Sequence, residues 1–227
     1  MNTPDIIQET GNYFRKVYAW MALGLAISGL TAYAVASNDS FVNYLFSHNW
    51  IFFALIILQI GTVIYLASQL KRISPDTAFF LFLLYCFLTG LTLSSIFLVY
   101  TFGSIVSAFL STAIMFAVMS LYGLGTKRDL TSTGKILTMG LFGIIIAMLI
   151  NMFLRSAGFD LFLSVIAIII FTGLTAYDTQ KLKRLNVIGN EGTPEDKKEA
   201  IIGALTLYLD FINLFLHLLR IMGKRRD

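Results

Sequence analysis

Charged residues are scarce in this chain, and proline and cysteine are scarcer still. Only 13% of the 227 residues are charged and 57% are hydrophobic, whereas soluble domains average about 25% charged and 45–50% apolar. A soluble domain of this size has no core large enough to bury so much apolar surface. Three prolines beside 20 phenylalanines exclude a disordered chain. The single cysteine, Cys86, excludes a disulfide within the chain.

The positive net charge does not indicate a nucleic-acid-binding protein. Seventeen basic and 13 acidic residues give a net charge of +4. The basic residues stand at the ends of apolar runs and form no stripe, which is typical of the flanks of membrane spans. We therefore expect a lipid bilayer as the partner of this surface and no nucleic acid.

Seven apolar runs reach or approach the length of about 20 residues that crosses a bilayer. They are residues 17–36, 50–70, 77–100, 104–122, 135–154, 161–179 and 201–219. The connections are short, so we expect one integral membrane domain over residues 1–227, all-α, with seven transmembrane helices. The longest connection contains turn residues, and Thr193 with Pro194 can begin a short helix before the last span.

The distribution of lysine and arginine predicts the orientation of the spans. With the N-terminus in the cytoplasm, the outside loops before the last span hold Arg155 alone. The inside segments hold twelve basic residues: Arg15, Lys16, Lys71, Arg72, Lys127, Arg128, Lys135, Lys181, Lys183, Arg184, Lys197 and Lys198. The C-terminal tail departs from the rule, since a full crossing of the last helix puts four basic residues outside: Arg220, Lys224, Arg225 and Arg226. We expect that full crossing, although a re-entrant last segment would restore the rule.

A polar stripe follows the last apolar run. It consists of residues spaced by three and four, which share one helical face: Gly203, Thr206, Asp210, Asn213 and His217. Such a face in a membrane must point to the bundle interior or to water, so we expect this helix to be central, surrounded by the other six. Charges inside spans are costly and functional by default, which makes Asp210 a candidate site residue. Thr206, Asn213 and His217 are candidate pore-lining residues, although His217 can equally complete a structural hydrogen bond.

A second acid, Asp178, ends the sixth run in the same half of the membrane as Asp210. Two carboxylates that approach closely cannot both ionise cheaply, so such a pair takes up a proton readily. When both are ionised, they form a hard oxygen site suited to Ca²⁺, completed by waters or backbone carbonyls. We expect no cofactor and no other metal site.

Arg72 stands at the inner end of the second run, on the same side of the membrane as Asp178. An ion pair between Arg72 and Asp178 would hold two helices together until a proton broke it. The alternative interpretation is that Arg72 extends to lipid phosphates.

Three segments of the chain resemble the transmembrane Bax inhibitor motif family of small seven-span proteins. They are Tyr177-Asp178 with Gln180-Lys181, the stretch Leu-Tyr-Leu-Asp-Phe-Ile-Asn-Leu-Phe at 207–215, and Gly-Leu-Thr-Leu-Ser at 90–94. The resemblance implies six helices around a seventh and a pH-sensitive Ca²⁺ leak. It places the proton-gated acidic pair on Asp178 and Asp210 and its arginine partner on Arg72. The short loops favour a bacterial plasma-membrane member.

Four functions compete, and the first is the pH-sensitive Ca²⁺ leak channel. The second is an interaction protein that modulates a membrane-bound protease or a stress or cell-death response, as family members do. The third is an intramembrane aspartyl protease, but such enzymes have Gly-x-Gly before the second acid, where this chain has Tyr208-Leu209, so we expect no enzyme. The fourth is a proton-coupled transporter, against which the lack of an inverted repeat counts.

Overall fold

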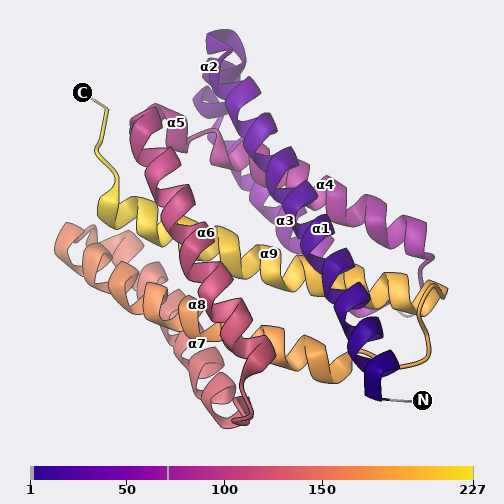
Figure 1. The fold of residues 1–227 in the computed structure, drawn as a ribbon. Coiled ribbons are helices and arrows are strands. Elements are labelled where there is room, and N and C mark those ends of the chain that lie inside the picture. The colour runs from indigo at the N-terminus through magenta and orange to yellow at the C-terminus, as the bar shows by residue number, and fades with distance from the viewer. Residues whose placement is uncertain (1–2, 71, 227) are drawn as a thin grey trace. The chain divides into compact units, whose positions relative to one another are not determined.

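The protein is described by a computed structural model that covers residues 3–70 and 72–226; Lys71, one of the predicted inside residues, lies outside this part. The helices in the described part are α1 (Thr3–Ala36), α2 (Asp39–Ser47), α3 (Asn49–Gln69), α4 (Pro75–Leu93), α5 (Ile96–Val99), α6 (Phe102–Gly125), α7 (Thr131–Leu154), α8 (Ala157–Leu185) and α9 (Pro194–Met222) (Figure 1). Seven helices are long and apolar enough to cross a membrane. The predicted all-α, seven-span fold is therefore confirmed.

Several helices extend beyond the predicted apolar runs, because polar residues outside a bilayer do not interrupt backbone hydrogen bonding. α1 begins at Thr3 rather than at residue 17, and α8 continues to Leu185 rather than ending at 179. The predicted short helix after Thr193 is confirmed, but it is continuous with the last span. The Thr193 hydroxyl accepts a 3.2 Å hydrogen bond from the N–H of Asp196, and Pro194 occupies the first helical position, where its missing N–H costs nothing.

The third predicted run, residues 77–100, is not one continuous helix. α4 ends at Leu93, and α5 adds a single turn after Ser94 and Ser95. The Ser94 hydroxyl donates to the carbonyl of Leu91 at 2.6 Å, and the Ser95 hydroxyl donates to that of Thr92 at 2.8 Å. Serine hydroxyls that bond to the backbone in this way compete with helical hydrogen bonds, which accounts for the break.

The chain forms two compact units, and the first comprises the chain up to Val99 together with Asn186–Leu205. Within it, α4 packs against α1 and α3. A Cβ on Gly90 would lie only 2.6 Å from the Cβ of Thr31 in α1. The hydroxyl of Ser28, also in α1, donates to the carbonyl of Cys86 at 2.7 Å. The absence of a side chain at Gly90 thus lets α1 and α4 approach closely.

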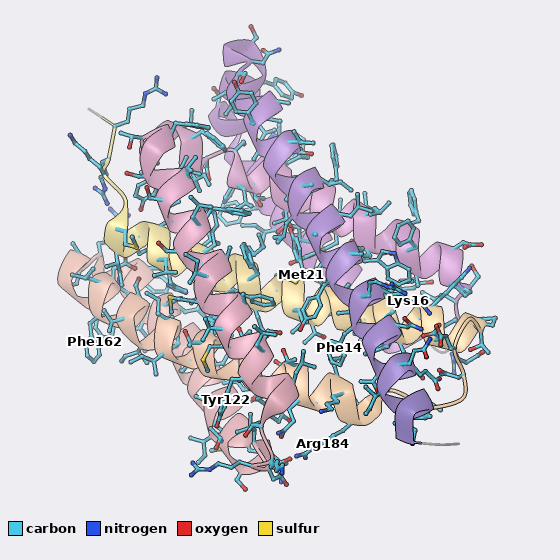
Figure 2. All side chains as sticks on the ribbon, in the orientation of Figure 1. Phe14, Lys16, Met21, Tyr122, Phe162 and Arg184 are labelled. Carbon is cyan, nitrogen blue, oxygen red and sulfur yellow. The ribbon has the colours of Figure 1, made fainter. Side chains whose placement is uncertain are left out.

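Hydrogen bonds and an ion pair tie the start of α9 and the loop before it to α1 within the first unit. Lys16 forms a 2.6 Å ion pair with Asp196, whose side chain is only 3% exposed (Figure 2). The same carboxylate accepts the N–H of Gly192 at 2.8 Å. The carboxylate of Glu9 accepts the N–H of Gly189 at 2.7 Å, and Gly189 has the positive φ of 94° that favours glycine. These contacts therefore hold the loop before α9 against α1.

The second unit comprises Tyr100–Leu185 and Thr206–Arg225. Within it, α8 packs against both α6 and α7, and α7 and α8 run side by side in Figure 1. A Cβ on Gly123 would overlap the carbonyl of Ala176, and one on Gly134 would overlap the ring of Tyr177. These two glycines allow α6 and α7 to lie close to α8 on either side of the residue pair that precedes Asp178.

The last span, α9, is the most buried of the seven. In the apolar 18-residue stretch of α9, 72% of the residues are buried, compared with 44% or less in the corresponding stretches of the other six spans. This agrees with the predicted interior position. α9 is unbroken from Pro194 to Met222, so the re-entrant alternative does not fit. After it, the carbonyl of Lys224 accepts the N–H of Thr101 at 3.0 Å, and Arg220 pairs with Asp160 at 3.0 Å. The tail therefore lies at the ends of α6 and α8 that are predicted to be outside.

Substituting alanine at Gly123 tests the close contact between α6 and α8. Because the new methyl group would overlap the Ala176 carbonyl, Gly123→Ala should lower the free energy of unfolding by about 1–3 kcal/mol. The matched control is Gly143→Ala in α7, where a Cβ meets nothing within 4 Å, and it should leave stability unchanged or slightly raised. Thermal unfolding in detergent micelles measures both. Equal unfolding temperatures for the two variants would contradict a structural role for Gly123.

Candidate functional site

A cavity of about 400 Å³ lies within the second unit, between α7, α8 and α9. Its walls are mostly apolar, with polar groups from α8 and α9 among them. The lining residues are Thr138, Leu141, Ile144, Ile145, Met148, Phe171, Leu174, Asp178, Thr206, Leu209, Asp210, Asn213 and His217. Both predicted acids and all three candidate pore-lining residues are therefore brought together at one cavity.

The polar stripe of α9 faces this cavity over three helical turns. Thr206, Asp210, Asn213 and His217 all line it, as their spacing along one helical face requires. Asn213 donates its amide N–H to the carbonyl of Leu209 at 2.8 Å. Gly203, the remaining member of the stripe, lies outside the cavity lining.

Two side chains of this stripe are buried with polar atoms that lack a partner among the described residues. Asp210 is 5% exposed, and its Oδ2 accepts no hydrogen bond there. His217 is 7% exposed, and its Nδ1 is likewise without a partner, while its ring stacks on Phe171 at 6.1 Å between centroids. Buried polar groups normally have hydrogen-bond partners. Oδ2 of Asp210 and Nδ1 of His217 are therefore the polar atoms of this cavity best placed to bind water or an ion.

Asp178 reaches the cavity from α8, and the helix around it is fixed by hydrogen bonds. It is half-buried and close enough to Asp210 for the two carboxyl groups to interact electrostatically. The neighbouring Thr179 donates its hydroxyl to the carbonyl of Thr175 at 2.7 Å and lies 3.0 Å from the hydroxyl of Ser120 in α6. The backbone that carries Asp178 is thus held against α6.

Gln180, which follows Asp178 in the motif, has a positioning role. Its side-chain carbonyl accepts the N–H of Leu130 at 2.9 Å, and its amide donates to the carbonyl of Arg128 at 2.7 Å. Both partners belong to the connection between α6 and α7. Gln180 therefore holds that connection against α8 two residues after Asp178, a contact that the sequence pattern alone did not reveal.

Lys181 is the cation of the second unit that acts on both acids. It stands three residues after Asp178, a spacing at which helical side chains are neighbours. Its ammonium group lies 5.9 Å from the centroid of the Tyr177 ring. The sequence analysis counted Lys181 only as an inside charge and missed this relation, although the spacing to Asp178 could have indicated it. Thr138 of α7, which also lines the cavity, was missed as well.

Arg72, the predicted partner of Asp178, lies in the turn after α3. Its N–H donates to the carbonyl of Gln69 at 2.8 Å, and its side chain is exposed. Arg72 belongs to the first unit and Asp178 to the second. Their ion pair would join the two units and stays a prediction.

The donor set of the cavity does not form a tight metal site. Among the residues that the structure describes, no three His, Cys, Asp or Glu side chains come together as a metal site. Ca²⁺ takes six to eight oxygen ligands, and Asp178 and Asp210 supply at most four. The pair is therefore suited to transient contact with a hydrated cation rather than to tight binding.

Comparisons with known proteins match nearly the full length of the sequence. Residues 10–227 match the family described as "Inhibitor of apoptosis-promoting Bax1". The chain is 48% identical to a protein of Borreliella burgdorferi over 98% of this chain and 99% of that one. It is 48% identical to inner membrane protein YbhL of Escherichia coli K12, over 94% of this chain and 92% of that one. It is 35% identical to a membrane protein of Streptococcus pyogenes serotype M1, over 93% and 92%. The chain is thus an integral membrane protein that belongs to the Bax inhibitor family.

Proposed function

We propose that this protein is a pH-sensitive Ca²⁺ leak channel, gated by protonation of Asp178 and Asp210, with Arg72 as the partner of the pair. The observation that supports it most is that both carboxylates and the polar stripe of α9 line one cavity inside membrane-spanning helices. Intramembrane acids that face a cavity mark ion or proton pathways. Thr206, Asn213 and His217 would line the pathway.

In the proposed gating, a proton competes with the guanidinium group of Arg72 for the carboxylate of Asp178. When both acids are ionised, Arg72 pairs with Asp178 and favours the closed state. Protonation of one carboxyl group weakens that pair, while the other carboxylate still attracts a cation. A tenfold difference in proton affinity between the closed and open states, about 1.4 kcal/mol, shifts their ratio tenfold. No covalent step is needed.

We also propose a bacterial plasma (inner) membrane as the location, with the N-terminus in the cytoplasm. YbhL, 48% identical to this chain, is an inner membrane protein. The excess of basic residues in the segments assigned to the inside supports the orientation. In that orientation, Asp178 lies in the cytoplasmic half of α8.

Asparagine at either acid tests the gate. Asparagine keeps the shape of aspartate but neither ionises nor takes up a proton, so Asp178→Asn and Asp210→Asn should flatten the pH dependence of Ca²⁺ flux. Flux into liposomes at pH 6, 7 and 8 measures it. Wild-type flux should rise as the pH falls, by about tenfold in total for the tenfold difference in proton affinity between the two states. The variants should change by less than about twofold over the whole range.

The matched control for these variants is Asp160→Asn, since Asp160 pairs with Arg220 at the other end of α8. It should retain the wild-type pH dependence. Unchanged pH dependence in both Asp178→Asn and Asp210→Asn would exclude the pair as the gate. No flux at any pH from folded wild-type protein would exclude the channel and favour the alternative, an interaction protein that modulates a membrane-bound protease.

Removing the charge of Arg72 tests the proposed partner. Arg72→Gln should raise Ca²⁺ flux at pH 8 roughly fivefold, because the closed state loses an ion-pair contribution of about 1 kcal/mol, and it should have little effect at pH 6. Lys71→Gln removes the same charge one residue earlier and should leave the profile unchanged. An effect of Lys71→Gln without one of Arg72→Gln would contradict the assignment of Arg72. A uniform change at all pH values would contradict any gating role.

A further inference from the structure

A second hollow lies in the second unit, along a face of α8 that differs from the face carrying Asp178. It has a volume of about 310 Å³. Its lining residues come from the ends of α6 and α8 and from the start of α7 with the connection before it: Met119, Tyr122, Arg128, Asp129, Leu130, Thr133, Gly173, Ala176 and Tyr177. None of these residues takes part in the cavity of the acidic pair.

Arg128 is held in place at this hollow by its backbone. Its N–H donates to the hydroxyl of Thr126 at 3.2 Å, and its carbonyl accepts the amide of Gln180 at 2.7 Å. The guanidinium group takes part in none of the three ion pairs among the described residues. Its charge therefore remains available to a ligand, on a backbone that both contacts fix.

Asp129 also lines the hollow, but its charge is compensated. It forms a 2.8 Å ion pair with Arg184 at the end of α8 (Figure 2). It also accepts hydrogen bonds from the N–H and the hydroxyl of Thr131 at 2.9 and 2.6 Å. Hydrogen bonds from Thr131 and the neighbouring Arg184 lower the pKa of Asp129 to about 2. Asp129 thus stays ionised and paired at neutral pH, which leaves Arg128 as the uncompensated charge of the hollow.

The surroundings of the hollow are apolar and exposed. Gly173, Ala176 and Tyr177 of α8 line it together with Tyr122, which is labelled near the end of α6 in Figure 2. Next to the hollow, Val118 of α6 stands one helical turn before Tyr122 and is 59% exposed, and Ile136 of α7 stands three residues after Thr133 and is 69% exposed. In a membrane-spanning helix such surfaces contact acyl chains, and tyrosines concentrate at the headgroup level.

We propose that this hollow binds the phosphate group of an anionic membrane phospholipid. Arg128 pairs with the phosphate oxygens, for which its planar guanidinium is suited. The hydroxyl of Thr133, on the same hollow, donates a further hydrogen bond. The acyl chains extend over Val118 and Ile136. A soluble phosphate would gain only the contacts with Arg128 and Thr133, so the exposed apolar surface on both sides assigns the site to a lipid.

The adjacent basic residue provides a matched control. Lys127 carries the same charge one position before Arg128 and is also exposed, but it does not line the hollow. A specific site distinguishes the two residues, whereas diffuse attraction to an anionic surface does not. Arg128→Lys keeps the charge and loses the planar fork, so it separates charge from geometry.

The test is labelling of the full-length protein by a photoactivatable phosphatidylglycerol in phosphatidylcholine vesicles, with the labelled peptides identified by mass spectrometry. Wild type should be labelled at peptides that line the hollow. Arg128→Gln should lower that labelling roughly tenfold, because the variant loses a charge-assisted hydrogen bond to the phosphate worth about 1.5 kcal/mol. Lys127→Gln should retain wild-type labelling, and Arg128→Lys should fall between them.

Three outcomes would overturn the proposal. Equal losses in Lys127→Gln and Arg128→Gln would indicate diffuse surface charge. No loss in Arg128→Gln, with circular dichroism and thermal unfolding like those of wild type, would exclude Arg128 as the phosphate ligand. Abolition of labelling by millimolar glycerol phosphate in vesicles would indicate a site for a soluble phosphate. Because none of these measurements involves Ca²⁺ flux, they are independent of the proposed channel activity.

Discussion

A carboxylate within a membrane-spanning helix must be shielded from lipid, and Asp210 imposes this requirement on the second unit. A charged residue at the centre of a span costs roughly 2.5–3.5 kcal/mol on insertion. The thirteen Leu, Ile and Phe residues between 201 and 221 outweigh that cost, at about −0.3 to −0.6 kcal/mol each. α9 can therefore insert with Asp210 in place. Facing the acid away from lipid explains why α9 is the most buried span and why its polar stripe lines a cavity.

α8 is the element through which this requirement reaches the rest of the unit. It carries Asp178, and it also provides the surface against which α6 and α7 pack. The contacts at Gly123 and Gly134 leave no space for a side chain, so these helices have little freedom to shift along α8. Thr179 and Gln180 add polar contacts on either side of the same helical turn. Asp178 therefore lies on a helix, α8, that is closely packed against α6 and α7.

Much of this fold follows from the sequence because a bilayer permits few solutions. Apolar runs of about 20 residues predict spans, and the spacing of Thr206, Asp210 and Asn213 predicts a shared face; both hold in the structure. The helices extend past the predicted spans, by 14 residues at the start of α1, because hydrophobicity records where lipid begins and not where backbone hydrogen bonds stop. The break after Leu93 was not predicted, because it depends on hydrogen bonds from the hydroxyls of Ser94 and Ser95 to backbone carbonyls, which a hydrophobic pattern does not record. The relation of Lys181 to the two acids was not predicted, because a lysine just after a span is expected as part of the basic flank of any membrane helix.

In the proposed channel, the geometry of the two acids would favour passage of a cation over its storage. Asp210 is buried with one oxygen unpartnered among the described residues, and Asp178 is half-buried on the same cavity. Four carboxylate oxygens at most leave Ca²⁺ dependent on water for the rest of its shell. An ion held in this way keeps much of its hydration and leaves readily. A proton would compete for the same oxygens without needing a coordination shell, so under the proposed function a site too poor to retain Ca²⁺ would still respond to pH.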